Sequence, residues 1–317
     1  MLFKPEKVDS TASGKTIGSL DKSRNLRDSF LLQFGCIPTS ILTYDKKDRS
    51  IDVHAADSYV NTSVVKKYSK HYDGHRKEIP NFDKIFNASG ANVRLGALSR
   101  FPQNIGRLLV QFYCPEKGTV YDPFAGHNSR MQLTFELGRN YAGVDISKEF
   151  MEANRSIRRH LIRRARQSLL SNDVIPSIRL FECSSSKVDL PNDSCDFTVT
   201  SPPYWNIEHY GDEPEQLGNA KTYEGFLDLL RLHIVENYRI LKSESFCCWC
   251  INDFKIDGIY RPFHADLIPY FVNAGFVLHT IYIIDLGRPI HASFVQWILK
   301  LKAFPKQHEY CLVFRKG

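Results

Sequence analysis

The run Ser201-Pro202-Pro203-Tyr204 has side chains suited to holding a planar amine. It follows Asp196 to Val199, whose composition is typical of a strand. Proline fixes φ, donates no N–H and drives the preceding residue out of the helical region. We therefore expect a rigid turn in which the Ser201 hydroxyl and the Pro202 carbonyl point at one place beside the Tyr204 ring. Two prolines after a strand also occur in turns that have only a structural role. Other motifs must therefore decide whether this turn is catalytic or structural.

A second motif lies upstream, between residues 118 and 145. The short strand predicted at 118–121 leads into Asp122-Pro123-Phe124-Ala125-Gly126, a helix is expected at about 130–137, and the next strand ends at Asp145. This order is typical of the nucleotide-binding half of a doubly wound sheet. An acid about twenty residues after the turn commonly accepts ribose hydroxyls. Because the turn lacks the Gly-x-Gly-x-x-Gly pattern, a nicotinamide dehydrogenase is disfavoured.

Together these motifs resemble the S-adenosylmethionine-dependent DNA amino-methyltransferases, which modify N4 of cytosine or N6 of adenine. Asp122 to Gly126 matches their cofactor turn, Gly143 to Ser147 their ribose-binding acid, and Ser201 to Tyr204 their catalytic motif. The resemblance covers about residues 95–317. From Ser201 onward the chain is similar to phage-type DNA modification methylases, with Asn252-Asp253-Phe254 and a closing His308 to Phe314.

The resemblance implies a role for each matching residue and no metal ion. The catalytic residues it implies are Ser201, Pro202, Pro203 and Tyr204. The cofactor-binding residues it implies are Phe101, Asp122, Pro123, Phe124, Ala125, Gly126, Asp145, Ile146, Glu182 and Ser201. Two positions depart from the family pattern. Asn128 stands where a glycine is usual, and Glu182-Cys183-Ser184 stands where an acid contacts the adenine amine.

The apolar spacing predicts the elements that position these motifs. A helix is expected through Ile105, Leu108, Leu109 and Phe112. Further helices are expected at 149–170, 223–241 and 262–274, and strands at 178–181, 245–251, 277–285 and 310–314. This alternation, with the resemblance, predicts a Rossmann-like class I methyltransferase of the α/β class. Its seven-stranded sheet should be mainly parallel with an antiparallel last strand, and Cys247 and Cys250 should be buried reduced thiols.

We expect two parts in the 317 residues: an N-terminal arm and DNA-contacting extension at 1–94, and the methyltransferase domain at 95–317. The net charge of +7 and pI near 8.9 are compatible with double-stranded DNA as partner. Basic residues alternate with aromatic ones between positions 66 and 77. We expect target recognition in residues 30–95 with the 206–222 and 286–308 loops. Six arginines between Arg155 and Arg166 favour a solvated face or a protein contact.

No apolar run is long enough to span a bilayer, and the polar N-terminus lacks a signal-peptide core. We therefore expect a cytoplasmic protein, in a bacterial or a phage-infected cell, with no membrane partner. Two alternatives stay open: an RNA base amino-methyltransferase, and a catalytically idle nucleic-acid-binding subunit with the same fold. Ser201 leans weakly towards cytosine as target. The recognition sequence, an accompanying endonuclease and the oligomeric state are left open.

Overall fold

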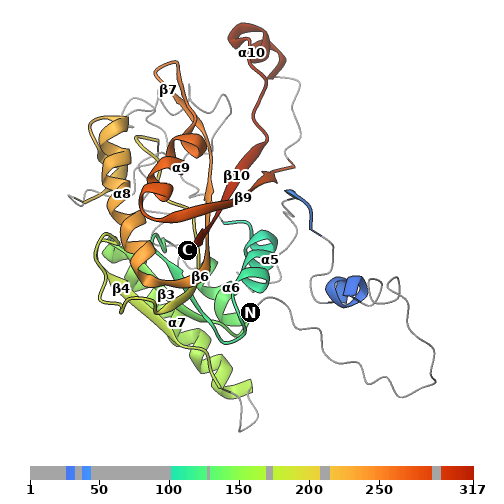
Figure 1. The fold of residues 1–317 in the computed structure, drawn as a ribbon, viewed down its shortest axis with the longest axis vertical. Coiled ribbons are helices and arrows are strands. Elements are labelled where there is room, and N and C mark those ends of the chain that lie inside the picture. The colour runs from blue at the N-terminus through green and yellow to red at the C-terminus, as the bar shows by residue number, and fades with distance from the viewer. Residues whose placement is uncertain are drawn as a thin grey trace, which may run out of the picture.

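One eight-stranded sheet organises the protein in a computed structural model (Figure 1). The structure describes residues 26–32, 38–43, 101–126, 129–168, 174–207, 215–287 and 294–317. The strands lie in the order β1-β9-β10-β6-β5-β2-β3-β4. Their bounds are Ile41–Thr43 (β1), Thr119–Asp122 (β2), Asn140–Asp145 (β3), Ile178–Glu182 (β4), Cys195–Thr200 (β5), Leu241–Ile251 (β6), Phe276–Asp285 (β9) and His308–Lys316 (β10). A separate antiparallel hairpin consists of β7 (Phe254–Ile256) and β8 (Ile259–Arg261).

The pairing confirms the predicted Rossmann-like α/β fold. Strands β2 to β6 run parallel where they pair, and β10 is antiparallel to both β6 and β9. The predicted strand number, seven, is wrong by one. The segment Ile41–Thr43 adds an eighth strand, parallel to β9. It is held by the buried Leu42 side chain and by a 2.8 Å hydrogen bond from Asn104 Nδ2 to the Thr43 carbonyl.

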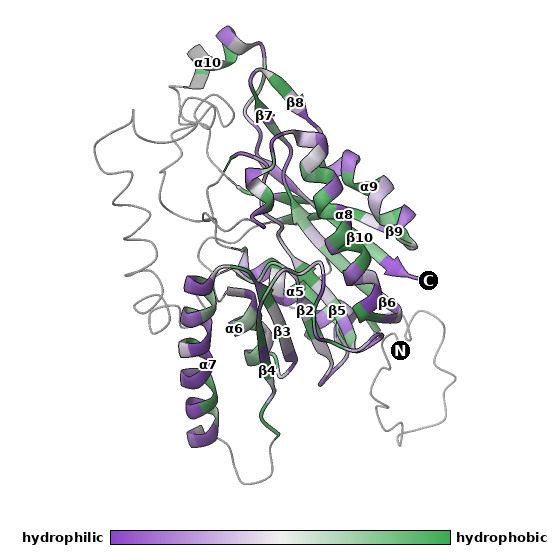
Figure 2. Cartoon of the chain, turned by 90° about the vertical axis from the view of Figure 1, so that its left-hand side faces the viewer, coloured by the Kyte–Doolittle hydropathy of each residue, from purple (hydrophilic) through white to green (hydrophobic). Residues whose placement is uncertain are grey.

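Helices cover both faces of the sheet. They are α5 (Gln103–Tyr113), α6 (Ser129–Glu136), α7 (Lys148–Ser168), α8 (Tyr223–Ile240) and α9 (Phe263–Asn273). Helix α10 (Phe294–Leu301) stands apart from the sheet (Figure 1), and a 3₁₀ turn lies at Leu217–Asn219. Apolar residues of α8 and α9 pack with Trp249 and Phe314, whereas those of α5 and α6 pack with Val199 and Cys248. The central strands are therefore buried on both sides, and Figure 2 shows them as the most hydrophobic part of the molecule.

Strand β6 illustrates this double burial. Cys247 and Trp249 face one core cluster, and Cys248 and Cys250 face the other. Both Cys247 and Cys250 are buried and free of disulfides, as predicted. The Cys247 sulfur accepts a 3.0 Å hydrogen bond from Asn237 Nδ2.

Most predicted elements are confirmed within a few residues, with three corrections. Phe112, expected on the buried face of α5, is 42% exposed, because the buried stripe runs through Ile105, Leu109, Val110 and Tyr113. The β7–β8 hairpin and α10 lie where no element was expected. Predictions for the basic segment at 66–77, for Asn128 and for 208–214 fall outside the described residues. No helix in the described ranges is long and apolar enough to cross a membrane.

Candidate active site

The predicted site residues end neighbouring strands at one edge of the sheet. Asp122 ends β2, Asp145 ends β3, Glu182 ends β4, and Ser201 follows β5. These strands are parallel, so their carboxyl ends meet at this edge. Strand order reverses between β2 and β5, since β3 and β4 lie on one side of β2 and β5 on the other. Ligands of open α/β sheets bind at such a switch point.

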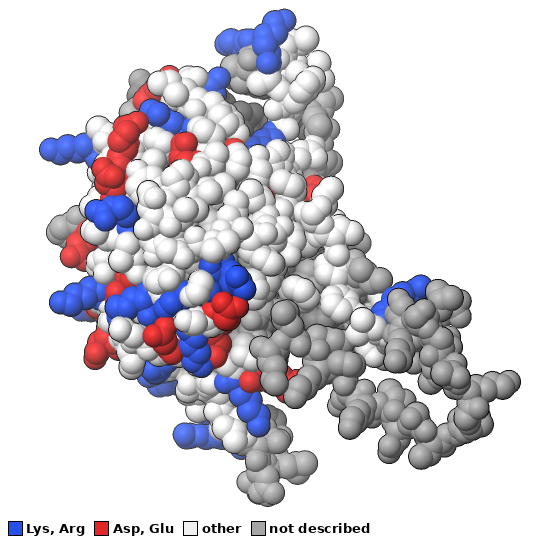
Figure 3. All heavy atoms as spheres, viewed as in Figure 1, with Lys and Arg blue, Asp and Glu red and all other residues white. Residues whose placement is uncertain are grey.

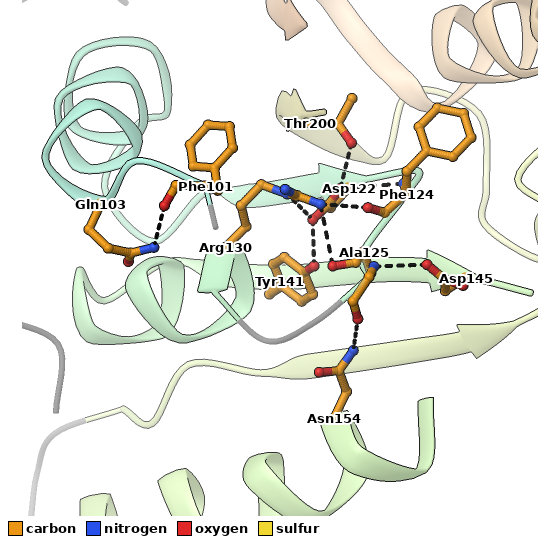
Figure 4. Close-up of polar contacts among 11 residues, drawn as sticks. Phe101, Gln103, Asp122, Phe124, Ala125, Arg130, Tyr141, Asp145, Asn154 and Thr200 are labelled. Atoms are coloured by element: carbon orange, nitrogen blue, oxygen red, sulfur yellow. Dashed lines mark hydrogen bonds and ion pairs between the residues drawn. The ribbon is translucent and has the colours of Figure 1, made fainter. Parts of the chain in front are cut away.

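The Asp122 carboxylate is fully buried and receives hydrogen bonds from three side chains (Figure 4). Arg130 Nε and the Tyr141 hydroxyl donate to Oδ2 at 2.7 and 2.8 Å, and the Thr200 hydroxyl donates to Oδ1 at 2.7 Å. The Phe124 amide adds a longer contact of 3.4 Å. We call Asp122, Arg130, Tyr141 and Thr200 the Asp122 hub. The hub ties the predicted cofactor turn to the strand that leads into Ser201, while direct contact of Asp122 with a cofactor stays a prediction.

Arg130, which was not among the predicted site residues, shapes the turn itself. Its Nη2 donates to the carbonyls of Phe124 and Ala125, at 2.5 and 3.3 Å. Its guanidinium lies 5.2 Å from the centre of the Phe101 ring. Burial opposes its charge, but Asp122 and Tyr141 hold the pKa of Arg130 above its ordinary value. In the sequence, the signal for this role was an arginine at the start of a predicted helix, eight residues after Asp122.

Gly143 permits one bond of the hub. A Cβ atom at Gly143 would lie 2.4 Å from Cε1 of Tyr141, because the tyrosine ring passes over this position. Both residues are on β3, and Tyr141 uses this path to reach Asp122. A side chain at position 143 would therefore displace Tyr141 from the carboxylate.

Asp145 differs from Asp122 in its partners. Its Oδ2 accepts from the Gly126 amide and its Oδ1 from the Ser147 amide, both at 2.8 Å. Gly126 has a φ of 50°, in the left-handed region, and its carbonyl accepts from Asn154 Nδ2 at 2.8 Å. Burial raises the pKa of Asp145 to about 6, although the two amides lower it. Each carboxylate oxygen can accept a further bond, which suits a vicinal diol.

Glu182 lies beside Asp145, its register partner across β3 and β4. Its Oε2 accepts from Arg155 Nη1 at 2.7 Å, and this ion pair orients the glutamate. Arg158 donates to the carbonyl of Ile178. Two of the six arginines on α7 are therefore engaged with β4, and Figure 3 shows Lys and Arg mixed with Asp and Glu over much of the charged surface seen from this side.

The predicted catalytic turn is anchored at both ends. At its start, Thr200 is bound to Asp122. Pro202 is buried, whereas Ser201, Pro203 and Tyr204 are partly exposed. Beyond its end, Trp205 Nε1 donates to the Ala220 carbonyl at 2.8 Å, and the Asn206 amide, at a φ of 51°, donates to the Gly218 carbonyl at 2.9 Å.

Aromatic rings form a wall behind Tyr204. The ring centres of Phe254 and Phe263 lie 6.0 and 6.1 Å from that of Tyr204, in edge-on geometry. The wall leaves Tyr204 supported from behind and partly exposed, as a stacking surface requires. Neither phenylalanine was predicted as part of the site.

His233 connects the turn after β2 with the loop after β4. Its ring centre is 5.3 Å from that of Phe124, and its Nδ1 lies 2.7 Å from Ser185 Oγ. Burial lowers the pKa of His233 to about 4, so the imidazole is neutral at pH 7. The sequence offered no signal for this contact, since a histidine on an amphipathic helix is ordinarily a core residue.

Comparison with known proteins bears on this geometry. Residues 31–156 match the model of a family described as DNA methylase, N6_N4_Mtase. The resemblance to DNA amino-methyltransferases is confirmed. A type II methyltransferase, M.MjaVI from Methanocaldococcus jannaschii, is 32% identical over 106 residues. That match covers 33% of this chain and 53% of the relative, so the chain spans about half the relative's length.

Solved structures give partial superpositions. TrmN from Thermus thermophilus, 13% identical, aligns with a TM-score of 0.45 over 68% of this chain and 49% of its own. A SAM-dependent methyltransferase from Methanosarcina mazei is also 13% identical. It aligns with a TM-score of 0.44 over 69% of this chain and 99% of its own. A third structure is that of a protein assigned as a DNA modification methylase from Thermus thermophilus, in complex with S-adenosyl-L-methionine. It is 29% identical and aligns with a TM-score of 0.30 over 41% of this chain and 50% of its own.

Proposed function

We propose that this protein transfers a methyl group from S-adenosylmethionine to the exocyclic amine of a DNA base, N4 of cytosine or N6 of adenine. The observation that carries the proposal is the Asp122 hub. One buried carboxylate joins a turn of the cofactor-binding type to the turn containing Ser201 to Tyr204, through Thr200. The two turns thus share one rigid support at the switch point of the sheet. The match of residues 31–156 to the DNA methylase family model supports the same proposed function.

The residues at the edge fit the proposed cofactor. Asp145 would accept the ribose hydroxyls, since each of its oxygens accepts a single amide bond in the protein. Glu182 beside it would meet the adenine amine, and Ile146 would pack against the adenine. Phe101 and the turn Asp122-Pro123-Phe124-Ala125-Gly126 would enclose the methionine end. When bound, the cofactor supplies a methyl group already activated by its sulfonium.

The catalytic turn would prepare the amine. An aromatic exocyclic amine is a weak nucleophile because its lone pair is delocalised into the ring. Hydrogen bonds from this amine to Ser201 Oγ and to the Pro202 carbonyl favour a pyramidal nitrogen with a localised lone pair. These bonds would strengthen as the new C–N bond forms and the S–methyl bond breaks, so they would stabilise the transition state more than the ground state. S-adenosylhomocysteine would be the leaving group, and the methylated nitrogen would release one proton to water. Pro203 would hold the Pro202 carbonyl in place, and Tyr204 would stack on the base.

Double-stranded DNA is the proposed substrate. To reach Tyr204, the target base would leave the duplex, which costs a few kcal/mol. Stacking on an aromatic side chain returns about 1–3 kcal/mol per base.

Mass analysis of nucleosides tests the proposal. We expect N4-methylcytosine or N6-methyladenine in DNA treated with protein and S-adenosylmethionine. In single-turnover assays at saturating cofactor, Ser201→Ala and Tyr204→Ala should lose most of the methylation rate, and Tyr204→Ala should bind the cofactor normally. Ser243→Ala, at the exposed far end of β6, is the matched control. Methylation of RNA alone, or parental rates in both variants, would overturn the proposal.

A further inference from the structure

A second group of polar side chains lies beside the catalytic turn without belonging to it. It comprises Asp253, two residues after β6, with Tyr260, His264, Lys306, His308 and Tyr310. We call it the Asp253 cluster. Phe254 and Phe263, whose rings flank Tyr204, directly adjoin Asp253 and His264 in the chain. The cluster and the catalytic turn therefore share one aromatic wall.

Asp253 is the acceptor at the centre of this cluster. Its side chain has no exposed surface. The Tyr260 hydroxyl donates to Oδ2 at 2.6 Å, and both the amide and Nδ1 of His264 contact Oδ1, at 3.0 and 2.7 Å. Lys306 Nζ lies 3.9 Å from Oδ2 and donates to the Asp253 carbonyl at 3.2 Å. The carboxylate thereby fixes the β7–β8 hairpin, the start of α9 and the segment before β10 relative to one another.

Three basic side chains surround the ring of Tyr310. The His264 ring is stacked on it, with centres 3.9 Å apart and planes 12° apart. Lys306 Nζ lies 5.2 Å from the ring centre, and His308 Nε2 lies 3.1 Å from the Tyr310 hydroxyl. About a quarter of the His264 and Lys306 side chains is exposed, so a ligand can reach them. Among the described residues, Nε2 of His264 has no hydrogen-bond partner.

Carboxylates as well as basic groups lie around Lys306. Asp253 and Glu309 are the carboxylates that act on Lys306. Burial nevertheless lowers the pKa of Lys306 to about 8, and burial together with Lys306 lowers the pKa of His308. A bound anion would offset this effect of burial, because it stabilises the protonated forms of Lys306 and His308. Phosphodiesters are the anions that DNA places next to every base, and they accept charge-assisted hydrogen bonds from lysine and histidine.

We propose that Lys306, His264 and His308 bind one phosphodiester of the strand that carries the target base. This inference rests on the proposed function and adds a backbone contact to it. Phosphate contacts set the register of a protein on the duplex without reading sequence. Held here, the backbone would lie near Tyr204, because Phe254 and Phe263 contact the Tyr204 ring and adjoin Asp253 and His264 in the chain.

Strand β10 supplies a matched control. At its other end, Lys316 Nζ donates to Asp193 Oδ1 and to the Leu241 carbonyl, both at 2.7 Å, and lies 4.6 Å from the Tyr238 ring centre. Lys316 thus has the same kinds of partner as Lys306: a carboxylate, a carbonyl and an aromatic ring. It lies at the opposite edge of the sheet, beside the start of β6. Lys316→Met therefore reports the structural effect of losing such an ammonium group.

The experiment uses duplexes containing the site that the wild-type protein methylates. In each duplex a single phosphate near the target base is replaced by a neutral methylphosphonate. We expect Lys306→Met to weaken DNA binding by about tenfold and to lower the salt-dependence slope by about 0.9. One methylphosphonate should weaken wild-type binding similarly and leave Lys306→Met unaffected. His264→Gln should weaken DNA binding less than Lys306→Met does, and its response to the methylphosphonate should be smaller than that of the wild type. Lys306→Arg and Lys316→Met should bind DNA as the wild type does.

The outcomes test the phosphate site separately from the proposed methyltransferase activity. If the wild type methylates DNA but every methylphosphonate affects wild type and Lys306→Met equally, the phosphate site is refuted and the methyltransferase stands. If the wild type methylates no DNA, both fail. If circular dichroism shows that Lys306→Met is unfolded, the wild type is compared with His264→Gln on the same methylphosphonate duplexes. Equal effects on both proteins would then refute the phosphate site.

Discussion

Asp122 and Asp145 end adjacent parallel strands, and both were predicted to bind the cofactor, yet the structure surrounds them differently. Asp122 is fully buried and receives hydrogen bonds from three side chains, one of them a buried arginine. Asp145 accepts two backbone amides and forms no ion pair with a described residue. A carboxylate whose acceptor capacity is filled by side chains supports the fold. One that keeps spare capacity is available to a ligand.

The largest expected effect comes from removing the Asp122 carboxylate. Asp122→Ala leaves the buried Arg130 guanidinium without its counter-charge, which costs about 3–5 kcal/mol of unfolding free energy. Urea denaturation followed by circular dichroism measures this loss. The double variant Asp122→Ala/Arg130→Met should recover part of it, because the unpaired charge is then absent. Equal stability of wild type and Asp122→Ala would show that the hub does not support the fold.

The pH dependence of cofactor binding tests the other carboxylate. The pKa of Asp145 is raised to about 6, and hydroxyls that donate to the ionised form should lower it on binding. Affinity should then be full above pH 6 and lost as the pH falls through 6, by about tenfold between pH 7 and pH 5. Calorimetry measures this change. His233, with a pKa of about 4, does not titrate in this window.

Asp145→Asn is the control for that profile. It should bind the cofactor on the order of tenfold more weakly at pH 7 and show no change down to pH 5. Stability without cofactor should show the opposite trend. The folded-state pKa of Asp145 exceeds the unfolded value, so its cost to stability diminishes as the pH falls from 6 towards 4. A profile shared by wild type and Asp145→Asn would remove Asp145 from the cofactor site.

The sequence could place both acids but could not distinguish them. Each ends an apolar run at the right distance from a turn, and this local pattern identifies strand ends. The difference lies in partners that are distant in the chain, since Thr200 is 78 positions after Asp122. The edge strand β1 was missed for a related reason: three residues pair with β9, more than two hundred positions later.

Other omissions had a local signal. Asp257 and Gly258, both with positive φ, stand between the paired Ile256 and Ile259, and such a dipeptide is typical of a two-residue hairpin turn. The hairpin could therefore have been predicted. The convergence of Tyr260, His264 and Lys306 on Asp253 could not, because it requires the hairpin, α9 and the segment before β10 to be placed in space.

The smallest expected effect concerns the bond that joins the hub to the catalytic turn. Thr200→Val removes one donor from Asp122, which costs about 1 kcal/mol of unfolding free energy. Thr198→Val is the matched control. It lies two residues earlier on β5, is equally buried, and loses a 2.7 Å bond to Asn237 instead. Both variants should be similarly destabilised and bind the cofactor normally. Only Thr200→Val should lower the single-turnover methylation rate, because Ser201 follows directly and its position depends on the Thr200 hydroxyl. Equal rates in the two variants would show that the hub supports the cofactor turn alone and does not position the catalytic one.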